Sequence, residues 1–261
     1  MLRPRIIPCL LLRDKGLIKT VKFDEDKYVG DPLNAVKIFN EKEVDELMIL
    51  DIDATIQRRE PDFELIKNIA IESRMPLCYG GGVKTVYHAK KIISLGAEKV
   101  AISSAAIENP AIISNIAMAV GTQSVVVVID VKYSGLFKKA EVVSHNGKVS
   151  TGLNPTEFAK RCEELGAGEI VINSVDRDGM MAGFDTKIIR EIRNSICLPI
   201  TILGGAASLE DISAAIKEFG VIGVAAGSLF IFKGKYKAVL INYPNISEKK
   251  LILSNGGFNI Q

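Results

Sequence analysis

Two glycine clusters each follow a short apolar segment and could bind phosphate. The first contains Gly81 and Gly82 in the stretch YGGGV, and the second contains Gly204 and Gly205 in LGGAA. Glycine lets backbone N–H groups approach an anion without a Cβ in the way, and a helix that begins behind the cluster adds partial positive charge. A tight turn would explain either cluster alone. Two equivalent clusters favour a ligand with a phosphate at each end.

Small or hydroxyl-bearing residues follow one apolar segment after each glycine cluster. They are Ser103 and Ser104 in ISSA, and Gly227 and Ser228 in AAGS. We expect them to complete the two anion sites. Lys19, nearer the amino terminus, could reach a phosphate or could be an ordinary solvated lysine.

Asp130 is the best candidate for a general acid or base. It ends the apolar run SVVVVID, and a carboxylate beside apolar side chains can have its pKa raised toward neutrality. The alternative is a structural carboxylate that pairs with a nearby lysine such as Lys132.

Eight short segments rich in Val, Ile and Leu predict buried parallel strands, because they lack the alternation of a strand with one solvated face. Amphipathic segments with helical spacing separate most of them, and several end in glycine, as helices often do. This order predicts a (β/α)8 TIM barrel, whose active site lies where the strands end. The strands are expected at residues 5–12, 46–53, 75–80, 99–103, 124–130, 169–176, 198–205 and 221–228.

An internal repeat divides the predicted barrel into two halves. Glu46 corresponds to Glu169, and Gly81 corresponds to Gly204, each pair lying 123 residues apart. A barrel built from duplicated (β/α)4 halves explains this constant spacing. We expect a single domain over residues 1–261, with half-barrels of about 1–120 and 121–245 and a short C-terminal tail.

Four charged residues stand at the starts of predicted strands, at the end opposite the active site. They are Arg5, Glu46, Lys99 and Glu169. Such residues are usually solvated, and the inside of a barrel is normally apolar. Because their signs alternate around the ring of strands, we expect a charged layer that closes the barrel floor.

Composition excludes several classes of protein. The net charge is +2, which argues against recruitment to nucleic acid or to an anionic membrane. The four cysteines, Cys9, Cys78, Cys162 and Cys197, form no metal-binding pattern and are expected to be buried free thiols. The sequence lacks an export signal and a membrane-length apolar run, so we expect a cytoplasmic protein with no metal and no cofactor.

A series of ordered motifs resembles the HisF family, the cyclase subunit of imidazole glycerol phosphate synthase. The motifs include KYVGDPLNAVKIF, DELMILDIDAT, PLCYGGGVKT, GTQSVVVVIDVK and PITILGGAASLED, and the resemblance spans residues 1 to about 240. It implies a heterodimer with a glutaminase subunit of the HisH type. Ammonia released by the glutaminase would enter through a floor gate and pass through the barrel to a bisphosphate substrate.

The family's functional positions can be carried over to this sequence. The gate falls on the four charged residues just named. One phosphate site falls on Gly82, Ser103, Ser104, Asp178 and Gly179, and the other on Gly204, Gly205, Gly227 and Ser228.

Two departures from the cyclase pattern argue for a different reaction. The family uses two catalytic aspartates; the second corresponds to Asp130, but the first position holds Leu11, and Ser103 stands where cyclases usually carry Asn. A leucine cannot transfer a proton. The stretches RPRIIPCLLLRDKGLIKT and KYKAVLINYP resemble a paralogous branch tied to acetamidino modification of surface-polysaccharide sugars.

The resemblance therefore favours an ammonia-conducting subunit of a glutamine amidotransferase, which acts as an enzyme within its complex. A separate sugar amidotransferase would be a further partner. Two alternatives stay open: a true cyclase of histidine biosynthesis, and a scaffold that binds a phosphorylated metabolite and only activates its glutaminase.

Overall fold

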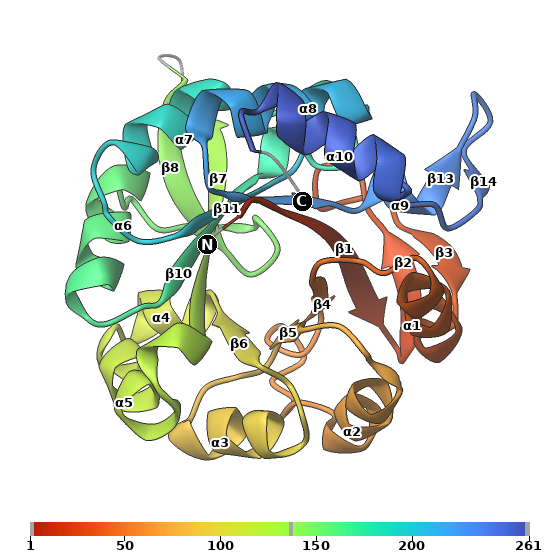
Figure 1. The fold of residues 1–261 in the computed structure, drawn as a ribbon. Helices are drawn as coiled ribbons and strands as arrows, with labels where there is room; N and C mark the ends of the chain where they lie inside the picture. Colours follow the sequence, from red (N-terminus) through yellow and green to blue (C-terminus); the bar gives the residue numbers. More distant parts are fainter. Residues whose placement is uncertain (1–2, 136–137, 259–261) are drawn as a thin grey trace.

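Eight parallel strands close into a barrel in the computed structural model, which describes residues 3–135 and 138–258 (Figure 1). Strand β1 pairs with β4 on one side and β12 on the other, and β7 pairs with both β6 and β10, so the barrel has no open edge. The (β/α)8 prediction is confirmed. The eight strands are β1 (Arg5–Arg13), β4 (Leu47–Asp51), β5 (Leu77–Gly80), β6 (Lys99–Ile102), β7 (Val125–Ser134), β10 (Glu169–Ser174), β11 (Ile200–Leu203) and β12 (Gly223–Ala226).

Helices surround the barrel and are fixed by local capping. The side chain of Asp31 accepts a hydrogen bond at the start of α1, and Ser208 and Asp211 form a capping box at the start of α8. These contacts satisfy backbone N–H groups that a helix start leaves free. The helices are α1 (Pro32–Glu41), α2 (Phe63–Glu72), α3 (Val86–Ser94), α4 (Ser104–Glu108), α5 (Ala111–Val120), α6 (Pro155–Glu164), α7 (Thr186–Arg193), α8 (Leu209–Phe219), α9 (Ser228–Ile231) and α10 (Ile246–Asn255).

Short antiparallel strands extend the barrel at two related places. After β1 come β2 (Gly16–Lys19) and β3 (Lys27–Gly30), and after β7 come β8 (Lys139–Ser144) and β9 (Val149–Ser150). The sequence prediction did not include them. They follow the first and fifth barrel strands, as the duplicated halves require, and they carry Lys19 and the β8–β9 turn to the mouth of the barrel. A separate small hairpin joins β13 (Phe232–Lys233) to β14 (Ala238–Val239).

The apolar core has two parts. The larger part lies between the strands and the helices, and the smaller part fills the barrel interior. Cys9, Cys78 and Cys162 are buried free thiols as expected, but Cys197 is exposed, because it lies after α7 in the loop before β11. The interior cluster consists of Ile7, Cys9, Met48, Cys78, Ala101, Val126, Val128, Val171, Leu203 and Ala225.

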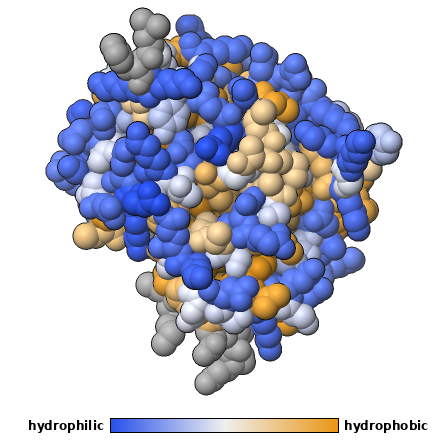
Figure 2. All heavy atoms as spheres, turned by 90° about the horizontal axis from the view of Figure 1, so that it is seen from above, coloured by the Kyte–Doolittle hydropathy of each residue, from blue (hydrophilic) through white to orange (hydrophobic). Residues whose placement is uncertain are grey.

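The C-terminal region is more than a short tail. Helix α10 packs against α8, and Ile252 and Leu253 of α10 belong to the larger core. Its other face leaves Ile246 and Leu251 exposed. Figure 2 shows one side of the molecule, where hydrophobic residues emerge between mainly hydrophilic ones. Within the described ranges, no helix has the length and apolarity needed to cross a bilayer.

Candidate active site

Two adjoining cavities open where the barrel strands end. All the residues predicted for the mouth line one or both of them, and Asp178, Leu203 and Gly227 line both. Lys19, Gly81, Gly82, Ser103, Ser104 and Asp130 line the larger cavity. Gly179, Gly204, Gly205 and Ser228 line the smaller one.

Gly179 lies in a different cavity from the one expected. The family resemblance grouped it with Gly82, but it lines the smaller cavity beside Gly204 and Gly205. The reason is strand order, since the loop after β10 lies next to the loop after β11. Asp178 reaches the larger cavity as well, because it lies at the boundary between the two.

The paired glycines make equivalent backbone contacts. A Cβ on Gly81 would collide with the carbonyl oxygen of Asp51, and a Cβ on Gly204 would lie 2.7 Å from the carbonyl oxygen of Ser174. Gly81 has a φ of +119° and Gly204 a φ of +89°, which also favour glycine. Asp51 and Ser174 are themselves separated by the repeat spacing, so the duplication extends to this backbone contact.

Lys19 is a buried residue of the site and not a solvated surface lysine. Its side chain is turned into the mouth, where Nζ donates a hydrogen bond to the carbonyl oxygen of Cys9 over 2.6 Å. Burial lowers its pKa, and the nearby Asp178 opposes that effect. Gly227 leaves room for the ammonium group, because a Cβ there would collide with Nζ. Lys19 can therefore contact an anion at the junction of the two cavities.

Asp130 is held by hydrogen bonds from neutral donors. The Nδ2 group of Asn173 donates to Oδ1 over 2.8 Å, and the hydroxyl of Ser103 donates to Oδ2 over 3.4 Å. Removal from bulk water raises the pKa of Asp130 to about 7, although both hydrogen bonds oppose this shift. Among the described residues Asp130 makes no ion pair, so the pairing with Lys132 is wrong. A carboxyl group with this pKa can exchange protons near neutral pH.

Asn173 is a site residue that the sequence reasoning missed. It lies within β10, and strands give no local signal that separates a residue facing the cavity from a core residue. His145 and Asn146, from the β8–β9 turn, also line the larger cavity and were missed with their hairpin. Leu11 lines the same cavity, whereas Asp14 is exposed in the β1–β2 turn.

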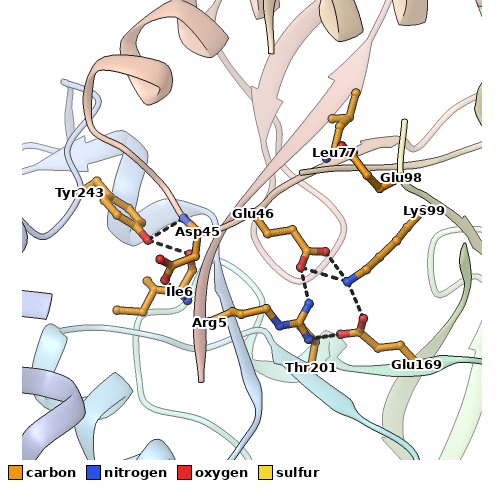
Figure 3. A network of polar contacts seen from close by, with 10 residues as sticks. All are labelled: Arg5, Ile6, Asp45, Glu46, Leu77, Glu98, Lys99, Glu169, Thr201 and Tyr243. Carbon is orange, nitrogen blue, oxygen red and sulfur yellow. Dashed lines mark hydrogen bonds and ion pairs between the residues drawn. The ribbon is translucent and has the colours of Figure 1, made fainter. Parts of the chain in front are cut away.

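The four floor residues form a closed ring of ion pairs (Figure 3). Arg5 contacts Glu46 and also Glu169, the latter over 2.7 Å. Lys99 Nζ lies 2.9 Å from Glu46 and 2.8 Å from Glu169, and the hydroxyl of Thr201 donates a further hydrogen bond to Glu169. Each charge thus meets two opposite charges, and the expected charged floor is present.

Charge pairing outweighs burial in this ring. Burial raises the pKa of Glu169, but Arg5 and Lys99 together lower it by more, so the net shift is downward. Burial lowers the pKa of Arg5 and of Lys99, but the two glutamates together raise each pKa by more, so the net shift is upward. Pairing therefore favours the charged forms of Arg5, Lys99 and Glu169. Above the ring, the apolar interior separates the floor from Asp130 and the mouth cavities.

No three acidic, His or Cys side chains within residues 3–135 and 138–258 are grouped to hold a metal ion. The groups at the mouth include backbone amides, hydroxyls, one buried ammonium and the carboxylates of Asp51, Asp130 and Asp178. These groups can bind phosphate oxygens and can move a proton.

Sequence comparisons give one consistent family. The profile described as histidine biosynthesis protein matches residues 5–237. A Leptospira borgpetersenii protein, named provisionally as imidazole glycerol phosphate synthase subunit HisF, is 55% identical over 97% of this chain and 99% of its own. A Vibrio vulnificus protein, named provisionally as subunit hisF3, is 55% identical over 97% of both chains. The imidazole glycerol phosphate synthase subunit HisF of Lactococcus lactis is 39% identical over 88% of this chain and 89% of its own.

Gly179 offers a test of the close backbone approach in the smaller cavity. Its φ is +68°, and a Cβ there would collide with the carbonyl oxygen of Thr20, whereas Gly152 has a φ of +70° with open space around it. We expect Gly179→Ala to lower the free energy of unfolding by at least about 2 kcal/mol more than Gly152→Ala, because only the first adds a collision to the same backbone strain. Urea denaturation measures both. Equal losses would contradict the contact.

Asp130 should make stability depend on pH. Its pKa of about 7 in the folded protein lies above the unfolded value of 3.8, so its contribution is fully present below pH 3.8 and is lost as the pH rises through 7. Relative to Asp130→Asn, the wild type should lose on the order of 1 kcal/mol or more between pH 4 and 8. Thermal unfolding at several pH values measures the difference, and parallel profiles would argue against the shift.

Glu169 should behave in the opposite way. Its pKa is lowered in the folded protein, so its contribution is present above the unfolded value of 4.5 and is lost as the pH falls through the folded value. At pH 7 we expect Glu169→Gln to lower the free energy of unfolding by about 1–3 kcal/mol, because two cations then share one carboxylate. The loss should shrink below pH 4. The exposed Glu157→Gln is the control, and an equally small effect of both would refute the ring's contribution.

Proposed function

We propose that this chain, which belongs to the histidine biosynthesis protein family among homologues of imidazole glycerol phosphate synthase subunit HisF, conducts ammonia. The ammonia would pass from a glutaminase to the mouth of the barrel. The observation that carries the proposal is the closed ring of Arg5, Glu46, Lys99 and Glu169 at the floor of an otherwise apolar interior.

Ammonia is the ligand whose chemistry suits this path. The interior side chains offer no charge and few polar atoms, so they favour a small neutral molecule over an ion. The charged ring lies below these apolar side chains, and while it is closed it excludes solvent ions. In this proposal the glutaminase of the HisH type docks on the floor as a heterodimer, and ring opening admits NH₃ but not NH₄⁺.

The mouth is proposed to bind a phosphorylated small molecule. Glycine loops, Ser104 and Lys19 supply anion-binding groups in the larger cavity, and Gly205 and Ser228 supply them in the smaller. Two adjoining sites fit a ligand with two phosphate groups. Asp130 lies in the larger cavity, where it can act on an acceptor as acid or base.

Leu11 argues against a full cyclase reaction. It lines the larger cavity where a second catalytic carboxylate would stand, and Asp14 is too exposed to replace it. Asp51 and Asp178 also line this cavity, but Arg59 pairs with Asp51, and Thr20 donates a hydrogen bond to Asp178 over 2.8 Å with Lys19 nearby. We therefore favour delivery of ammonia to a separate sugar amidotransferase in acetamidino-sugar formation. The greater identity to the relative named hisF3 than to the Lactococcus protein agrees with a divergent branch.

Histidine biosynthesis is the second candidate. Asp130 and both cavities favour it, as do the names of the relatives. A scaffold that binds a phosphometabolite and activates the glutaminase without conducting ammonia is the third. Mixing the purified chain with its proposed glutaminase tests the pairing of the two proteins. We expect the rate of glutamine hydrolysis to increase on mixing. No acceleration, with phosphate ligands present, would contradict the pairing.

Rescue of a histidine auxotroph that lacks the cyclase separates the first two candidates. We expect the wild-type chain, expressed with its glutaminase, to fail, since the loss of one of two acid/base groups removes about 10²–10⁴ in rate. Leu11→Asp should restore growth only in part, because Ser103 also differs. Growth yield on minimal medium is the measurement, with Asp130→Asn in the Leu11→Asp background as the control. Full rescue by the wild type would establish the histidine role instead.

A further inference from the structure

The floor end of β1 is paired by backbone on one side only. Strand β1 pairs with β12 from Arg5 onward, whereas its pairing with β4 begins only at Cys9, which lies opposite Met48. Arg5 N–H donates to Ile222 on the β12 side, so the backbone groups of Ile6 point to the β4 side. Pro8 lies on that same edge and has no N–H to donate. The β1–β4 seam therefore lacks a backbone ladder at the floor.

Side chains replace the missing ladder at Ile6. Its N–H donates to Asp45 Oδ2 over 2.9 Å, and its carbonyl oxygen accepts a hydrogen bond from the Tyr243 hydroxyl over 2.8 Å. The Asp45 N–H in turn donates to the Tyr243 oxygen over 3.3 Å. Figure 3 shows Tyr243, Asp45 and Ile6 close together, to the left of the charged ring.

The C-terminal segment holds both side chains in place. Lys249 on α10 lies 2.9 Å from Asp45 Oδ1 and also donates to the carbonyl oxygen of Glu43. The aromatic side chain of Tyr243 is buried against that of Phe230, with the two ring centroids 5.3 Å apart. The bridge is thus anchored in the core at one end and in α10 at the other.

The bridge joins the residues next to two members of the ring. Ile6 follows Arg5, and Asp45 precedes Glu46, so the contacts across the seam fix the distance between the backbones that carry this ion pair. We propose that Tyr243 and Asp45 are positioning residues that latch the floor ring closed, an inference that rests on the proposed role of the ring as a gate. Release of the latch separates the ends of β1 and β4 and opens the path to the interior.

Chemical labelling of cysteines can test the latch without the partner. Cys78 has no exposed area and faces the interior beside Glu46 and Lys99, so a small thiol reagent reaches it from the floor only when the ring opens. Cys162 is equally buried, but it lies on the buried face of α6, outside the barrel interior, and its labelling reports general unfolding. Cys197 is exposed and reports reagent activity. The rate of modification by methyl methanethiosulfonate at each cysteine follows from peptide mass spectrometry.

We expect Tyr243→Phe to speed the labelling of Cys78 about tenfold, because the seam loses two hydrogen bonds, and to leave Cys162 and Cys197 unchanged. Arg5→Ala, which removes a ring member, sets the rate for an open floor. Tyr133→Phe, which deletes a hydroxyl at the mouth end, is the matched control. Asp45→Asn, which weakens the contact to Ile6, provides a second variant and should also speed Cys78.

A Cys78 rate that stays at the wild-type value in Tyr243→Phe and Asp45→Asn would overturn the latch, as would a rise that Cys162 matches. Because this experiment uses the chain alone, its failure differs from a failure of the proposed function, which would appear as no acceleration of the glutaminase by the wild type.

Discussion

Four charges that balance one another close the floor of the barrel, and the other features of the molecule are arranged around them. Apolar side chains normally fill this layer. Arg5, Glu46, Lys99 and Glu169 can replace them because each contacts two partners of opposite sign. Loss of one member would leave an uncompensated charge in a poorly solvated place. The strands that carry the ring must therefore be held at fixed positions, and on the β1–β4 side Tyr243 and Asp45 do this in place of a backbone ladder.

The floor and the mouth differ in the way they treat charge. At the floor, contacts between opposite charges favour the ionised forms of Arg5, Lys99 and Glu169. At the mouth, Asp130 has only neutral hydrogen-bond donors, and its pKa rises to about 7. The apolar interior keeps the two ends apart, so a proton can be exchanged at the mouth without disturbing the ring. Leu11 extends this apolar interior to the edge of the larger cavity.

Much of the architecture could be predicted from the sequence, because both the buried strands and the duplication leave periodic signals. Because Gly81 and Gly204 occupy equivalent positions in the two halves, the repeat also predicted residues that line the mouth cavities. Contacts between segments distant in sequence could not be predicted. Asn173 reaches Asp130 only because β10 lies beside β7. Gly179 was assigned to the wrong cavity because the order of neighbouring loops decides its place. Lys19 becomes a buried residue only through β2, whose four residues are too few to give a clear pattern.

Isotope competition measures directly whether nitrogen passes through the barrel. A complex of this chain with the proposed glutaminase and the proposed sugar amidotransferase would receive glutamine labelled with ¹⁵N in the amide group, in a large excess of unlabelled ammonium. We predict that the amidated sugar carries mainly ¹⁵N, and that Val126→Trp, which fills the interior, removes this preference. A product whose nitrogen matches the bulk ammonium in the wild-type complex would contradict conduction through the barrel.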